Sequence, residues 1–253
     1  MKTINLSIGY ATRIVASGIN MELEAGKLLC LIGENGVGKS TLLRTLAGFQ
    51  KPISGELLID GVQLQDIPKR ELAKKIAVVL TDKLDVLNTT VYELVAMGRM
   101  PYTGFFGRLS EADKAIVEDS LKITGVEPSR KVSNLSDGER QKVMIARALA
   151  QQTPYIFLDE PTAFLDYPSK VRTMEMLKKL AHDYNKTILL STHDLEIALD
   201  IADRLVMMEK ETSETPEPSE TPETLIRVHI GNPKKRNNEK IPSFTSDALL
   251  TDC

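Results

Sequence analysis

Short apolar runs alternate with longer amphipathic stretches along most of the chain. Four runs are apolar on both faces, which is typical of strands buried in a mostly parallel sheet; they lie at residues 28–32, 76–80, 155–158 and 187–190. The stretches between them predict helices at 40–48, 68–75, 91–97, 110–124, 136–152, 168–184 and 194–202. Two half-polar runs, at 3–8 and 56–59, suit an accessory antiparallel sheet. The pattern indicates the α/β class, in which helices cover a sheet.

This alternation stops near residue 210. Residues 211–223 read ETSETPEPSETPE, without one apolar side chain and with the string SETPE present twice. Such a composition cannot build a core. We therefore expect a folded domain over residues 1–209 and a disordered or loosely attached tail over 210–253. Natural divergence and a shifted reading frame are both open explanations of the tail.

Composition and charge exclude several classes of protein. A chain of 253 residues with 42% apolar content is long enough for one sizeable core. Its 32 basic and 35 acidic side chains give no general electrostatic reason to bind nucleic acid or an anionic bilayer. No apolar run reaches the roughly 18 residues that span a bilayer, and the N-terminus lacks the apolar core of a signal peptide. With only Cys30 and Cys253 as cysteines, we expect a cytoplasmic protein in a reducing compartment.

A glycine-rich segment joins the strand predicted at 28–32 to the helix predicted at 40–48. It reads GENGVGKS over residues 33–40, the spacing of a phosphate-binding loop, or P-loop. Glycines let successive backbone N–H groups turn inward around a phosphate at the positive end of a helix. We expect Lys39 to reach the terminal phosphates and the Ser40 hydroxyl to coordinate Mg²⁺. The alternative is a plain glycine-rich turn, which the strand–loop–helix context disfavours.

An acidic pair, Asp159 and Glu160, follows the strand predicted at 155–158. The carboxyl ends of parallel strands line the crevice in which such sheets bind ligands. Asp159 is placed to hold Mg²⁺ through water, and Glu160 to polarise an attacking water. Alone, the pair would be read as an ordinary strand-end turn. The P-loop in the same chain favours the catalytic interpretation.

Three further segments follow in a fixed order: LSDGERQ at 135–141, AFLD at 163–166 and STHD at 191–194. Together with the P-loop and the acidic pair, they make residues 2–209 resemble the nucleotide-binding subunit of an ATP-binding-cassette (ABC) transporter. The first segment resembles the family signature, the second its D-loop and the third its switch-histidine loop. A serine hydroxyl and a glycine amide at a helix N-terminus also suit an anion on physical grounds.

The resemblance implies a RecA-like P-loop NTPase core, an antiparallel β subdomain and a helical signature subdomain over about residues 84–152. It implies ATP and Mg²⁺, and a homodimer in which each ATP lies between Lys39 of one copy and Ser136 of the other. The nucleotide-binding positions it assigns are Tyr10, Gly33, Asn35, Gly36, Gly38, Lys39, Ser40, Thr41, Ser136, Gly138 and Asp166. The catalytic residues would be Glu160, His193 and Lys39, and the metal ligands Ser40, Asp159 and Thr81.

The sequence departs from the family pattern at three places. Thr81 and Asp82 stand where the family has a glutamine that senses Mg²⁺ and couples to the membrane subunit, so the assignment between them is open. Asp137 and Glu139 replace a glycine and a glutamine of the signature and add negative charge near a phosphate. Past residue 209 the family continues with a glycine-containing turn, strand and helix, where this chain has the SETPE repeat.

The segment 91–108, VYELVAMGRMPYTGFFGR, resembles the helical-domain segment of ATPases that serve uptake of ferric siderophores, haem and cobalamin. The resemblance implies an ATP-hydrolysing importer subunit, peripheral on the cytoplasmic face of the plasma (inner) membrane. Its partners would be permease subunits and, indirectly, a substrate-binding protein, with no nucleic acid. One alternative is a soluble ABC ATPase acting on ribosomes or DNA, although such proteins carry two cassettes or a coiled-coil insertion. Another is a poorly hydrolysing regulatory subunit, suggested by Thr81, Asp137 and Glu139.

Overall fold

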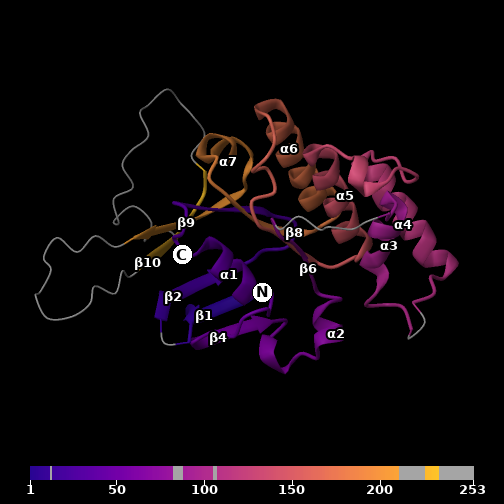
Figure 1. Ribbon diagram of the computed structural model, residues 1–253. Helices are drawn as coiled ribbons and strands as arrows, with labels where there is room; N and C mark the ends of the chain where they lie inside the picture. The colour runs from indigo at the N-terminus through magenta and orange to yellow at the C-terminus, as the bar shows by residue number, and fades with distance from the viewer. Residues whose placement is uncertain (12, 82–87, 105–106, 211–225, 234–253) are drawn as a thin grey trace, which may run out of the picture.

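The computed structural model describes residues 1–11, 13–81, 88–104, 107–210 and 226–233. Its larger sheet has six strands in the order β10-β9-β3-β8-β7-β6 (Figure 1). The strands are β3 (Leu28–Gly33), β6 (Ile76–Val79), β7 (Tyr155–Leu158), β8 (Thr187–Thr192), β9 (Arg204–Lys210) and β10 (Ile226–Gly231). β10 runs antiparallel to β9, and the other neighbours are parallel. Each of the four predicted buried runs forms a strand of this sheet.

A smaller antiparallel sheet lies on one face of the larger one. It has the order β2-β1-β4-β5 and consists of β1 (Lys2–Tyr10), β2 (Arg13–Glu22), β4 (Ser54–Ile59) and β5 (Val62–Gln63). The half-polar runs at 3–8 and 56–59 fall within β1 and β4. β2 was not predicted, because its ten residues bury only three side chains and show no long apolar run.

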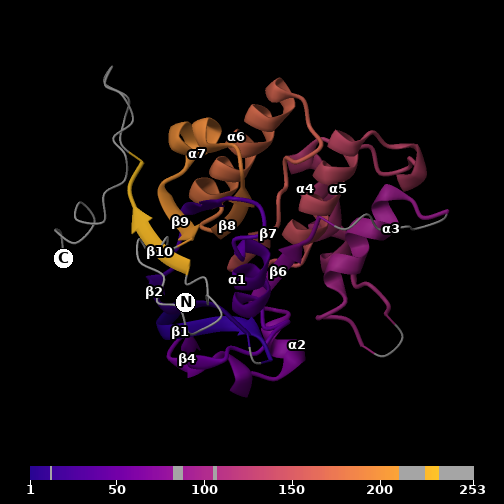
Figure 2. The same ribbon diagram turned by 60° about the vertical axis from the view of Figure 1, so that its left-hand side comes forward.

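Within the described ranges seven α-helices form, each at a predicted stretch. They are α1 (Lys39–Leu46), α2 (Lys69–Leu72), α3 (Val91–Ala96), α4 (Glu111–Thr124), α5 (Asp137–Ala150), α6 (Tyr167–Asp183) and α7 (Leu195–Ile201). Short 3₁₀ turns occur at η1 (Leu64–Asp66), η2 (Met97–Arg99) and η3 (Val132–Asn134). Helices α3, α4 and α5 pack together at one side of the molecule, away from the small sheet (Figures 1 and 2).

The apolar core is divided by the larger sheet. On β3, Leu28 and Cys30 face a cluster built with α3 to α7, whereas Leu29 and Leu31 face a cluster built with α1 and the small sheet. This alternation explains why the predicted central strands are apolar on both faces. Cys30 is a fully buried free thiol, and burial raises its pKa. In the described part of the chain, no helix combines the length and the apolarity that crossing a bilayer requires.

The structure differs from the sequence expectation at residues 226–231. This segment lies in the stretch expected to be disordered, yet it forms β10 along the edge of β9. Val228 and Ile230, two residues apart on the same face, pack against the cluster beneath the small sheet. Apolar residues at every second position are a strand pattern, but the polar residues on both sides of this segment made it hard to recognise in the sequence. Residues 211–225 and 234–253, with the SETPE repeat, lie outside the described residues.

Candidate functional site

The segment 33–40 forms the turn between β3 and α1 that its glycine spacing predicts. Gly36 and Gly38 have φ of +79° and +107°, in the left-handed region that favours glycine. At Gly38 a Cβ atom would also lie 2.4 Å from Cγ1 of Val15, so this position has no room for a side chain. Gly38 is the N-cap of α1, with no side-chain cap hydrogen bond. Asn35 and Gly36 are exposed at the outer turn of the loop. The loop therefore presents backbone N–H groups and a helix N-terminus at its mouth.

Lys39 folds back over this loop. Its Nζ donates hydrogen bonds to the carbonyl oxygens of Gly33, at 2.6 Å, and Glu34, at 3.0 Å. The same Nζ lies 3.9 Å from Oε1 of Glu160, and Lys39 is only 6% exposed. A buried ammonium held at the centre of the loop is a binding group for an anion such as a terminal phosphate.

Asp159, at the end of β7, lies beside the start of α1. Its Oδ1 accepts hydrogen bonds from Oγ of Ser40, at 3.1 Å, and from Oγ of Ser191 on β8, at 2.7 Å. A hydroxyl and a carboxylate oxygen side by side fit Mg²⁺, which takes hard oxygen ligands and is usually bound by one or two protein groups together with substrate phosphates and water. The described residues contain no cluster of three or more His, Cys, Asp and Glu that could hold a metal ion.

Glu160 has a left-handed backbone, with φ of +48°. In a non-glycine residue this conformation costs about 1–3 kcal/mol and persists only where its surroundings hold it. Here the backbone N–H of Glu160 donates to Oγ of Ser191 at 2.8 Å. The side chain lies between two groups: Oε2 is 2.8 Å from Nδ1 of His193, and Oε1 faces Lys39. Because an ionised carboxylate only accepts hydrogen bonds, this contact requires a proton on Nδ1 of His193. Glu160 is thereby aimed at the P-loop.

Thr81 lies near the acidic pair, but its hydroxyl bonds to the main chain. Oγ1 donates to the backbone carbonyl of Asp159 at 2.9 Å. This contact fixes the peptide that precedes Glu160 and does not place Oγ1 on the Asp159 carboxylate. Asp82, the other candidate for this position, lies outside the described residues.

Tyr10 lies at the end of β1, and its hydroxyl is 3.1 Å from Oγ1 of Thr41. Its side chain is 52% exposed and lines a groove of about 720 Å³ together with Phe49 and Ile53. An exposed aromatic ring tethered beside the P-loop helix is suited to stacking on a planar ring of a ligand.

Ser136 and Gly138 lie at the start of α5. Ser136 is the N-cap, and its Oγ donates to Oε2 of Glu139 at 2.9 Å and accepts from the Glu139 N–H at 3.3 Å. At Gly138 a Cβ atom would meet Cδ2 of Leu165 at 3.5 Å, an ordinary contact, so the single chain does not demand glycine there. Ser136 and Lys39 thus belong to separate hydrogen-bonded clusters within one chain.

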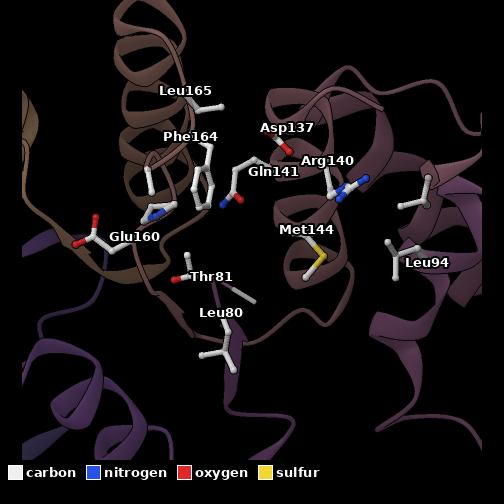
Figure 3. Close-up of a pocket in the computed structure, with 13 residues that line it drawn as sticks. Leu80, Thr81, Leu94, Asp137, Arg140, Gln141, Met144, Glu160, Phe164 and Leu165 are labelled. Carbon is white, nitrogen blue, oxygen red and sulfur yellow. The ribbon is translucent and has the colours of Figure 1, made fainter. Parts of the chain in front are cut away.

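The segment after Glu160, residues 161–166, leads to α6 and lies opposite α5. A pocket between them is lined by Thr81, Gln141, Glu160 and Phe164, among others (Figure 3). Phe164 and Tyr167 are each 62% exposed. Asp166, at the N-terminus of α6, is also exposed, and hydrogen bonding from Ser169 lowers the pKa of its carboxyl. This exposed stretch offers a surface to another molecule.

Two residues of the site were not singled out from the sequence. Ser191 belongs to the STHD segment, but its bonds to Asp159 and Glu160 depend on the pairing of β7 with β8. Arg130 precedes the signature and pairs with Glu139. Ser191 could have been found from its place within the STHD motif. Arg130 belongs to no motif, so the sequence did not indicate it.

Comparison with known proteins gives concordant results. A family model described as ABC transporter matches residues 16–163. An uncharacterized ABC transporter ATP-binding protein of Methanocaldococcus jannaschii is 46% identical over 82% of this chain and 72% of its own length. A probable siderophore transport system ATP-binding protein of Bacillus subtilis is 38% identical over 81% of this chain and 76% of its own length. Among solved structures, the dimeric structure of a bacterial ABC transporter cassette is 26% identical with a TM-score of 0.73, covering 93% of this chain and 99% of that one.

Proposed function

Since the chain belongs to the ABC transporter family, as the ATPase subunit of an importer, we propose that two copies hydrolyse ATP between them to drive uptake of an iron–siderophore, haem or cobalamin. The cargo passes through a separate permease. One observation carries the proposal: the Glu160 carboxylate lies between Lys39 and His193, at the mouth of the P-loop.

We propose a part in hydrolysis for each residue, supported by the distances within the site. The loop amides and Lys39 bind the phosphates, and Tyr10 stacks on the adenine. Ser40 and Asp159 would hold Mg²⁺, which supplies positive charge at the phosphates. Glu160 orients a water and takes its proton as the water oxygen bonds to the γ-phosphorus and the bond to ADP breaks. His193, through its bond to Glu160, holds the carboxylate in place. Thr81 acts on the backbone of the acidic pair, a positioning part that replaces the metal contact expected from the sequence.

A second copy completes the site. Ser136 and Gly138 form an anion-binding helix end in a cluster separate from Lys39, so we infer that they contact the ATP held by the partner copy. The exposed D-loop residues Phe164 and Asp166 would lie at the contact. The similar cassette solved as a dimer supports this arrangement. Binding of ATP then stabilises the closed pair, and hydrolysis releases it.

The permease is proposed to dock near η2, where Met97 and Met100 are 43% and 68% exposed. This places the protein on the cytoplasmic face of the plasma membrane, bound to a partner rather than to lipid, and without nucleic acid. A substrate-binding protein would act on the opposite face. We retain residues 1–209 as the catalytic domain, with its helical subdomain at about 84–152, and β10 as a strand added to it from the tail.

The substitution Glu160→Gln tests the catalytic part of this proposal. It keeps the shape of the side chain but removes its basicity, so we expect hydrolysis to fall by about 10²- to 10⁴-fold. ATP is then not consumed, and a dimer should accumulate with MgATP and be absent with MgADP, as measured by size-exclusion chromatography with light scattering. Glu118→Gln, an exposed position on α4, is the matched control. Normal hydrolysis by Glu160→Gln would refute the assignment.

A further inference from the structure

The N-terminus of α5, proposed to bind a phosphate, also carries a negatively charged side chain. Glu139 places a carboxylate in the first helical turn, where the proposed function puts a phosphate of the partner's ATP. Oε2 of Glu139 accepts hydrogen bonds from both the backbone N–H and the hydroxyl of Ser136, each at 2.9 Å. A serine hydroxyl has one proton, so Ser136 cannot donate to Glu139 and to a phosphate at the same time. Asp137, the other acidic residue here, lines the same pocket as Gln141 and Arg140 (Figure 3).

Arg130 meets this carboxylate from the loop between α4 and η3. Its Nη1 donates to Oε1 of Glu139, and its Nη2 lies 3.4 Å from Oε2. Nη2 also donates to the backbone carbonyl of Asn134, at 3.1 Å, two residues before Ser136. The guanidinium therefore ties together the loop that enters the signature and the first turn of α5. Hydrogen bonds from Arg130 and then Ser136 lower the pKa of Glu139 to about 2, so that the pair stays charged at physiological pH.

We propose that Arg130 is a positioning residue for the signature: it holds the Glu139 carboxylate, so that the Ser136 hydroxyl can turn to the γ-phosphate of ATP on the partner copy. When Ser136 turns, Oε2 of Glu139 keeps the Ser136 N–H and the Arg130 guanidinium as donors. The positive charge of Arg130 also offsets the repulsion between Glu139 and the phosphate. The inference rests on the proposed function, and it identifies Arg130 as the side chain that lets a signature with an acidic residue bind a phosphate.

The experiment measures the ATP concentration that gives half-maximal dimer in the Glu160→Gln background. Arg130→Gln should raise that concentration by roughly tenfold, because the negative charge of Glu139 then faces the phosphate without the offsetting charge of Arg130. Adding Glu139→Gln, which removes the charge that Arg130 offsets, should restore it to within about twofold of the background. Arg130→Lys keeps the charge without the two-pronged geometry and should fall between. ATP binding to the single copy, through Lys39, should not change in any of these variants.

Arg204→Gln is the matched control, because Arg204 forms a comparable surface ion pair with Glu24, at 37% and 47% exposure, away from α5. An unchanged ATP requirement in Arg130→Gln, or a raised one that Glu139→Gln fails to restore, overturns the inference while leaving the proposed function intact. Failure of the Glu160→Gln background itself to dimerise with ATP overturns both. Should Arg130→Gln fold poorly by thermal denaturation, the comparison between Arg130→Lys with and without Glu139→Gln decides in the same way.

Discussion

Ser191 joins the two acidic residues of the site through a single oxygen. Its Oγ donates to Asp159 and accepts from the N–H of Glu160, and the residue is fully buried on β8. The same hydroxyl that orients the Asp159 carboxylate therefore also holds the left-handed backbone of Glu160. Both contacts are to the acidic pair, so we propose that Ser191 positions Glu160, the proposed catalytic base.

Removal of this hydroxyl should affect turnover more than ATP binding. In Ser191→Ala we expect kcat to fall by about 10- to 100-fold, because Glu160 moves off its aligned position, with KM for ATP changed by less than about threefold. Steady-state ATPase assays measure both. Ser120→Ala is the control, since Ser120 is also a buried hydroxyl but bonds to a carbonyl on α4. A similar fall in kcat for the control would reduce the Ser191 effect to general destabilisation.

At this scale, sequence spacing predicted the residues whose chemistry is local. Lys39 and Ser40 follow from the P-loop, and Glu160 from its place after a buried strand. Ser191 and Arg130 did not follow, because their partners are brought to them by strand pairing and loop packing. Thr81 is predicted from the sequence as a metal ligand; its bond to the backbone carbonyl of Asp159 could not be predicted, because it depends on the path of the chain.

Among the elements, η2 is anchored by a buried cation. Arg99 is 4% exposed; its Nε pairs with Asp113 at 2.8 Å, and its Nη1 donates to the carbonyl of Ala150 at 2.8 Å. Its guanidinium also lies 4.0 Å from the ring centre of Tyr102. These contacts join η2 to α4 and to the end of α5. The exposed Met97 and Met100 are thereby presented on a rigid turn.

Arg99→Met should loosen this part of the molecule. The substitution removes the Arg99 donor from Oδ1 of Asp113 and from the Ala150 carbonyl, while Oδ2 of Asp113 keeps its hydrogen bonds from Ser110. Because a buried ion pair is broken, we expect a cost of about 3 kcal/mol in the free energy of unfolding. Urea denaturation followed by circular dichroism measures that loss. Lys114→Met, which removes an exposed ion pair on α4, should change stability little. Equal losses in the two variants would show that Arg99 is not an anchor.

Helices were predicted more completely than strands. The α4 start follows from Ser110, whose side chain and Asp113 form a capping box, and such caps are readable from local sequence. Four strands were not predicted: β2, β5, β9 and β10. β2, β5 and β10 are edge strands of their sheets, and β9 lies between β3 and β10. The pairing of β2 and β10 depends on β1 and β9, to which local sequence gives no direct access.

For the whole molecule, the decisive prediction concerns coupling to a permease. In membranes or nanodiscs holding the chain with its permease, we expect ATPase activity to rise several-fold when a substrate-binding protein loaded with an iron–siderophore, haem or cobalamin is added. The physical reason is that closure of the two copies is coupled to the permease through the docked face. Comparing the three cargoes assigns the substrate. Recovery of the chain with ribosomes or DNA, and no polytopic partner by mass spectrometry, would contradict the importer assignment.

The central position of β3 in the larger sheet also affects when the sheet can form during synthesis of the chain. Leu28 pairs with Ile188, and Cys30 pairs with Leu205, so the strand that enters the P-loop has sheet partners only far along the chain. At about 5–20 residues per second, roughly 10–30 s of synthesis separate that strand from its neighbours. During this interval the apolar strand β3 lacks both of its sheet neighbours, β8 and β9. A nascent or truncated chain that stops before β8 carries the complete P-loop sequence without a folded site for ATP.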